Sequence, residues 1–192
     1  MNHEDNLKKY EELHELSLKN PEEFWTPIAE KIHWYKKWDK VLDDSNPPFY
    51  KWFVGGKTNT CYNAVDRWAE KFPDKPAYII YCENGEETIL TYKELLTQVN
   101  KFASVLRDLG VEKGDRIIIY LPMIAEAAIA MLACVRIGAI HSVVFAGFSV
   151  QSLSVRIEDS EPKVLICSDG GLRGGKSVVL KDSIVDETLK VS

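Results

Sequence analysis

Hydrophobic positions follow a regular pattern only after residue 58. Within residues 1–58 the apolar side chains show little periodicity, and four of the five tryptophans lie there among four prolines. Large aromatic side chains of this kind usually contribute to packing, and lining a ligand pocket is the alternative. We expect residues 1–58 to form a tryptophan-rich, mostly helical or irregular extension that wraps over another body. Residues 59–192 are expected to form the first part of a separate domain.

Two helices are predicted from spacing and capping signals. Residues 59–72 form the first, with an N-cap at the first or second residue and one apolar face. That face consists of Val65, Trp68 and Ala69. Thr91 and Glu94 form a capping box ahead of the second helix. Its apolar side chains are Leu95, Val99, Phe102, Leu106 and Leu109. Gly110 suits the left-handed residue that ends a helix.

Strands account for most of the remaining pattern. Residues 77–83 and 87–90 flank Asn84-Gly85, a signal for a hairpin with a two-residue turn. Three further strands then alternate with two helices: strand Arg116–Leu121, helix Ile124–Ile137, strand Ala139–Phe145, a helix capped by Ser149 that runs to about Asp159, and strand Lys163–Cys167. This alternation predicts an α/β fold with parallel βαβ units and right-handed crossovers. A last amphipathic helix is expected over residues 181–190.

A glycine-rich segment follows the third of these strands. Residues 170–177 satisfy G-x-x-x-x-G-K-S, the phosphate-binding loop of nucleoside triphosphatases. Too few residues follow Ser177 to supply the later strand whose aspartate would hold magnesium. We therefore expect this loop to bind phosphate in another context, and a P-loop-type nucleotide-binding module remains the alternative.

Composition and charge exclude several classes of protein. A net charge of −5 argues against broad nucleic-acid binding, which favours a basic surface. The widely spaced cysteines form no C-x-x-C pair, so neither a structural zinc site nor any other metal site is expected. Reduced cysteines and a polar N-terminus without a secretory signal favour a cytoplasmic protein. No apolar run is long enough to span a membrane.

Several sequence runs resemble AMP-forming acyl-CoA synthetases, which are adenylate-forming enzymes. The matching runs are Leu90–Leu95, Gly114–Ile117 and Leu121–Met123. The run Met131–Phe145 resembles the short-chain branch of that family, the acetyl- and propionyl-CoA synthetases. The tryptophan-rich start is similar to the N-terminal segment of the same branch, through Phe24-Trp25 and Phe49–Phe53. The resemblance covers nearly the whole chain.

The resemblance implies a ligase reaction in a longer parent protein. Such enzymes use ATP and Mg²⁺ to convert a short-chain carboxylate to an acyl-adenylate and pyrophosphate, and the thiol of coenzyme A (CoA) then displaces AMP. This chain resembles only the N-terminal portion, so its partner would be the remainder of its own chain. No residue here is assigned a catalytic role, and the chain alone is expected to be inactive. A non-catalytic CoA-binding fragment and a self-associating fragment are the alternatives.

Matching positions also imply part of the site for the CoA nucleotide. The wall beside the adenine and ribose would be Phe145, Ala146 and Gly147, and the phosphorylated end would meet Arg173, Gly174, Gly175 and Lys176. Glycines let backbone N–H groups approach an anion closely, and an arginine can grip phosphate with two nitrogens. Many relatives have Gly-Gly at positions 146–147 and arginine at position 176, so the Ala146 methyl is expected to crowd CoA slightly. A solvated basic turn is the alternative interpretation.

Overall fold

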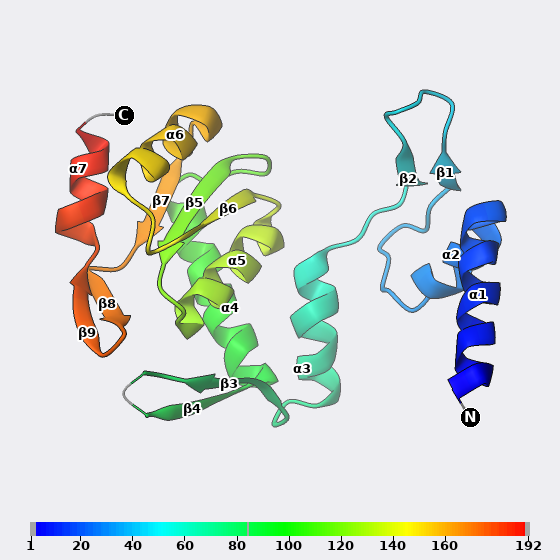
Figure 1. The fold of residues 1–192 in the computed structure, drawn as a ribbon, viewed down its shortest axis with the longest axis horizontal. Coiled ribbons are helices and arrows are strands. Elements are labelled where there is room, and N and C mark those ends of the chain that lie inside the picture. The colour runs from blue at the N-terminus through cyan, green and yellow to red at the C-terminus, as the bar shows by residue number, and fades with distance from the viewer. Residues whose placement is uncertain (1–2, 84, 191–192) are drawn as a thin grey trace. The chain divides into compact units, whose positions relative to one another are not determined.

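The computed structural model describes residues 3–83 and 85–190 (Figure 1). Contacts within the chain divide it into two compact units, Met1–Asn59 and Thr60–Ser192. No helix within the described ranges is long and apolar enough to cross a lipid bilayer.

The first unit contains two helices and a short antiparallel ladder. The elements are α1 (His3–Lys19), α2 (Pro21–Ala29), β1 (Lys40–Asp43) and β2 (Lys51–Val54). Helix α1 buries none of its described residues. Three aromatic rings pack against one another, with centroid distances of 5.0 Å for Trp34–Trp38, 5.4 Å for Trp34–Phe53 and 5.2 Å for Trp38–Phe53. These rings therefore have a packing role, and the ladder was not predicted.

The second unit begins with the predicted helix. The chain is helical from Thr60 to Lys71, in two parts: the π-helical turn η1 (Tyr62–Asp66) and α3 (Arg67–Lys71). The helix is confirmed, although a period of 3.6 residues could not indicate the wider turn. Strands β3 (Pro76–Tyr81) and β4 (Glu87–Thr91) form the predicted antiparallel hairpin.

The connection of this hairpin differs from the prediction. The N–H of Cys82 donates to the carbonyl of Glu86 at 2.9 Å, and the N–H of Gly85 donates back to the carbonyl of Cys82. Three residues, and not the predicted two, thus lie between Cys82 and Glu86, the last hydrogen-bonded pair of the hairpin. Gly85 has a φ of +87°. Asn84 lies outside the described residues. A turn followed by a left-handed glycine is a common three-residue alternative to the two-residue turn.

Helix α4 (Tyr92–Asp108) starts at the predicted capping box. The N–H of Glu94 donates to the Thr91 hydroxyl at 3.3 Å, and the N–H of Thr91 donates to the Glu94 carboxylate at 2.9 Å. This second bond is the main reason why the pKa of Glu94 lies below its ordinary value. Gly110, with a φ of +80°, follows the helix as predicted. Leu109 was wrongly assigned to the buried face, because it falls at the C-cap and is 58% exposed.

Three parallel strands form the central sheet. Strand β5 (Arg116–Leu121) lies between β6 (Ile140–Phe145) and β7 (Val164–Cys167). Helix α5 (Ala125–Ile137) connects β5 to β6, and α6 (Val150–Ser160) connects β6 to β7. The α/β class and the parallel βαβ units are confirmed.

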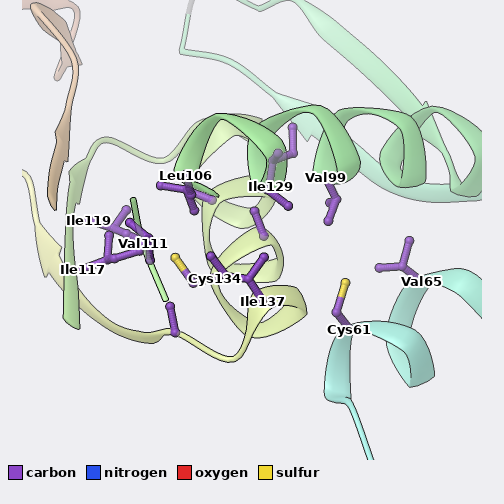
Figure 2. Packing of buried hydrophobic residues seen from close by; sticks show 14 of the residues in the cluster. Cys61, Val65, Val99, Leu106, Val111, Ile117, Ile119, Ile129, Cys134 and Ile137 are labelled. Carbon is purple, nitrogen blue, oxygen red and sulfur yellow. The ribbon is translucent and has the colours of Figure 1, made fainter. Parts of the chain in front are cut away.

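Hydrophobic clusters cover both faces of β5. Ile117 and Ile119 point into a cluster that includes side chains of α4 and α5, such as Leu106 and Cys134 (Figure 2). The alternate residues Ile118 and Tyr120 point into a second cluster, with Leu153 of α6 and residues near the C-terminus. Each of the four β5 side chains is 0% exposed. This alternation makes a three-layer arrangement in which β5 is the centre.

The glycine-rich segment is a β-hairpin and not a phosphate-binding loop before a helix. Strands β8 (Gly170–Arg173) and β9 (Lys176–Val179) are antiparallel, and Arg173 pairs with Lys176. Gly174 and Gly175 form the turn with φ values of +58° and +73°. The P-loop alternative is therefore wrong, because no helix begins at Lys176. The predicted final helix follows as η2 (Lys181–Val185) and α7 (Asp186–Leu189).

Removing the Thr91 hydroxyl tests the capping box. We expect Thr91→Ala to lower the free energy of unfolding by about 1 kcal/mol, because an orphan N–H at the helix start loses its acceptor. Urea unfolding followed by circular dichroism measures the change. Thr91→Ser keeps a hydroxyl and should stay within about 0.5 kcal/mol of wild type. Equal destabilisation by both substitutions would contradict the capping role.

Thiol labelling tests the packing of the core. Cys134 is 0% exposed, and burial raises its pKa to about 11, whereas Cys82 is exposed. Since the thiolate is the reactive form, we expect a thiol reagent at pH 8 to modify Cys82 at least about tenfold faster than Cys134. Peptide mass spectrometry measures both rates, and unfolding in urea should equalise them. Rapid labelling of Cys134 in the native protein would contradict this packing.

Candidate functional site

A small groove lies at the carboxyl end of β6, beside the β8–β9 hairpin. Its volume is about 130 Å³. It brings together Phe145, Ala146, Gly147 and Arg173, four of the residues singled out in the sequence. The other lining residues are Glu83, Pro122, Met123, Gly171, Leu172, Val178 and Leu180. Ligand sites in open α/β sheets usually occur beyond the carboxyl ends of strands, so the position is favourable for binding.

Phe145 and Arg173 form the most specific contact in the groove. The guanidinium carbon of Arg173 lies 5.5 Å from the centroid of the Phe145 ring, which is within the range of a cation–π contact. Gly147 permits this approach, since a Cβ there would lie 2.5 Å from a Phe145 ring carbon and 2.6 Å from Arg173 Nη1. A side chain at position 147 would therefore force the ring or the guanidinium to move.

A buried tyrosine fixes the turn after β6. The Tyr120 hydroxyl donates to the carbonyl of Phe148 at 2.9 Å, and burial raises the pKa of the phenol, so it remains a donor. The Phe148 ring packs edge-on against Phe145 at 6.1 Å and lies under the guanidinium of Arg156 at 5.2 Å. These contacts give Phe148 a packing role in the turn.

Ala146 contributes to the core as well as to the groove. It packs against the second hydrophobic cluster, which contains Tyr120 and Val144. Its methyl group therefore has an apolar environment that a glycine at this position would leave partly unfilled. The crowding of CoA by this methyl stays a prediction.

The tip of the β8–β9 hairpin presents backbone donors. The N–H of Gly174 donates to Oε1 of Glu83 at 3.3 Å, and the N–H of Gly175 donates to Oε2 at 3.1 Å. Consecutive N–H groups that converge in this way form an anion-binding nest. The turn thus already binds a carboxylate, which belongs to the β3–β4 hairpin.

Three of the predicted residues lie outside the lining of the groove. Gly174 and Gly175 lie at the turn beside it, and Lys176 is an exposed residue at the start of β9. Sequence reasoning missed Glu83 and the hairpin itself. Gly-Gly between two short runs is a two-residue hairpin signal, which could have indicated β8 and β9. No local signal links Glu83 to residues that are about ninety positions away.

Asp115 and His141 are two further polar side chains of the second unit, and neither lines the groove. Asp115 accepts from the N–H of Glu112 at 2.8 Å and pairs with Lys163 at 3.0 Å, and both contacts lower its pKa. Asp115 therefore stabilises a turn and forms a surface ion pair. His141 is half-buried, and burial lowers its pKa. Within the described ranges, no group of three or more His, Cys, Asp or Glu side chains could hold a metal ion.

Comparison with known proteins gives two family matches. Residues 65–191 match the AMP-binding enzyme family, and residues 10–64 match the acetyl-coenzyme A synthetase N-terminus. Relatives include an acetyl-coenzyme A synthetase of Deinococcus radiodurans, which is 50% identical over 96% of this chain and 28% of its own length. A propionate–CoA ligase of Escherichia coli is 48% identical over 92% of this chain and again 28% of its own length.

A solved structure agrees with these matches. The acetoacetyl-CoA synthetase from Streptomyces lividans superposes with a TM-score of 0.86 and 33% identity, covering 91% of this chain and 27% of that protein. The chain thus spans little more than a quarter of the length of the relatives it matches. Since one family match extends over residues 65–191, the chain belongs to the family of AMP-binding enzymes.

Proposed function

We propose that this chain contributes part of the CoA nucleotide site to an AMP-forming short-chain acyl-CoA synthetase. The complete reaction joins a carboxylate to CoA and converts ATP to AMP and pyrophosphate. The observation that carries the proposal is the contact of Phe145, Gly147 and Arg173 within one groove. An aromatic face, a close backbone approach and a guanidinium together suit a purine nucleotide that bears phosphate.

Each of the three residues has a distinct role in the proposed site. The exposed face of Phe145 offers a surface for the adenine ring, and Phe145 is 49% exposed. Arg173 supplies a planar fork for phosphate oxygens. Gly147 leaves room for the Phe145 ring and the Arg173 guanidinium to lie beside each other. Lys176, at the start of β9, adds a compact positive charge to the same hairpin.

The size of the groove suits one part of a ligand. Complete ligand sites usually occupy about 300–1,000 Å³, whereas this groove has about 130 Å³. It is therefore suited to a purine ring or a phosphate group and not to a whole CoA molecule. The sites for ATP, Mg²⁺ and the carboxylate are assigned to the part of the relatives that this chain does not match.

The same proposal gives a role to each part of the chain. Residues 1–58 correspond to the N-terminal segment of acetyl-CoA synthetases, and residues 59–192 to the first part of the adenylate-forming domain. The remainder of the same polypeptide is the partner, and the complete enzyme is cytoplasmic. The match of residues 10–64 to the acetyl-coenzyme A synthetase N-terminus supports the first of these assignments.

Substitution of Arg173 tests the CoA site. We expect Arg173→Ala to weaken CoA binding by about tenfold or more, because a charge-assisted contact to phosphate is lost. Calorimetric titration of wild type should also show weaker binding of dephospho-CoA, and the variant should lose this difference. Arg173→Lys keeps the charge but not the fork and should give an intermediate value.

The control for this experiment is Arg107→Ala, which removes the same charge from the exposed surface of α4. It should leave the affinity for CoA unchanged. Equal binding of CoA and dephospho-CoA by wild type would exclude recognition of the 3′-phosphate by Arg173. No measurable binding of either ligand would overturn the proposed site.

An activity assay tests whether this chain acts alone. With ATP, Mg²⁺, CoA and either acetate or propionate, we expect no pyrophosphate release that depends on the carboxylate. The reason is that the chain matches only 28% of the length of its relatives. The full-length propionate–CoA ligase of Escherichia coli is the positive control. Carboxylate-dependent release by this chain would contradict the assignment of the chemistry to the unmatched part.

A further inference from the structure

Glu83 occupies the backbone donors that a phosphate in the groove would use. Its two carboxylate oxygens accept separately from the N–H groups of Gly174 and Gly175, at 3.3 Å and 3.1 Å. The residue is exposed and lies in the loop of the β3–β4 hairpin, and it also lines the groove. The contact therefore joins the tips of two hairpins that are far apart in the sequence.

The bonds of Glu83 are directed to the N–H pair and not to the neighbouring cations. Among the described residues, Glu83 forms no ion pair with Arg173 or Lys176. The Arg173 guanidinium lies over the Phe145 ring instead. Both cations thus remain available to an incoming anion, whereas the two backbone donors are already occupied.

A carboxylate and a phosphate oxygen compete for such a nest because both are anionic acceptors of similar geometry. The Gly174 and Gly175 positive φ values direct the two N–H groups to one side of the turn. The Glu83 carboxylate accepts a hydrogen bond from each of these two N–H groups. A phosphate that uses these donors must displace Glu83, and its negative charge would also be repelled by the carboxylate while that remains nearby.

We infer that Glu83 is an internal competitor for phosphate at the β8–β9 turn and thereby sets the affinity of the groove for its anionic ligand. This inference rests on the proposed CoA site for the identity of the ligand. In the empty groove the carboxylate holds the two hairpin tips together. When the ligand binds, its phosphate replaces the carboxylate at the N–H groups, and the β3–β4 loop is released.

The test compares Glu83→Gln with Glu86→Gln in the 192-residue chain. The first substitution removes the competing charge but keeps the size of the side chain. The second removes the same charge from the same loop, at a residue other than the one that accepts from Gly174 and Gly175. Two probes are titrated, CoA and inorganic pyrophosphate, and the amide resonances of Gly174 and Gly175 are followed by NMR.

We expect Glu83→Gln alone to shift both glycine amide resonances before any ligand is added. It should also tighten the binding of both probes by about two- to fivefold, which is the range for an exposed charge interaction. Glu86→Gln should differ little from wild type in both measurements. Unchanged glycine resonances in Glu83→Gln would overturn the contact, and unchanged or weaker binding of both probes would overturn the competition.

The two probes separate this inference from the proposed function. If CoA binds in a manner that depends on Arg173 but Glu83→Gln gives no gain, the competition is wrong and the CoA site stands. If CoA does not bind while pyrophosphate binds more tightly to Glu83→Gln, the competition stands and the CoA site is wrong.

Discussion

Burial of β5 on both faces is the constraint on which the second unit depends. Four successive side chains, Ile117 to Tyr120, are fully buried and alternate between two hydrophobic clusters. A strand of this kind needs a covering layer on each side, because either face alone would expose large apolar side chains to water. Helices α4 and α5 provide one layer, and α6 with the last helical turns provides the other. This layered arrangement sets the positions of the turns at the carboxyl ends of the strands.

The groove is a consequence of that layering. Phe145 is the last residue of β6, so its position is set by the parallel pairing of Leu121 with Phe145 in the sheet. The β8–β9 hairpin follows β7 directly and brings Arg173 back toward the same edge of the sheet. Strand β6 and the hairpin that follows β7 thus bring an aromatic ring and a cation to one place. The contact between them needs a glycine at position 147, where any side chain would collide with both.

Local signals predicted most of the elements, because they depend on short-range chemistry. The capping box at Thr91, the strand Arg116–Leu121 and the left-handed Gly110 each follow from a few adjacent residues. The π-helical turn at Tyr62–Asp66 was not predictable in this way. It occurs where Asp66 forms a two-point ion pair with Arg136 of α5, at 2.6 Å for the closer contact. Such a pair depends on the tertiary arrangement and leaves no periodic pattern in the sequence.

The candidate site likewise contains residues that the sequence indicated and one residue whose contact depends on the tertiary arrangement. Phe145, Gly147 and Arg173 were found from their resemblance to a family motif, and the structure brings these three together. Glu83 was not found, because its contact with Gly174 joins loops whose proximity depends on the complete fold. The glycine-rich segment left a P-loop open as an alternative because the pattern specifies residue types and not backbone geometry. The antiparallel pairing of β8 with β9, which ends at Arg173 and Lys176, distinguishes this hairpin from a loop that leads into a helix.

Tyr120 links the interior of the sheet to the turn beside the groove. Its ring belongs to the hydrophobic core, and its hydroxyl holds the backbone of the turn that carries Phe148. Replacement of this tyrosine by an apolar ring of similar size would keep the core filled but free the turn. A substitution at this position therefore has two separate structural effects, one on the packing of the core and one on the backbone of the turn, and a survey of core packing alone would detect only the first.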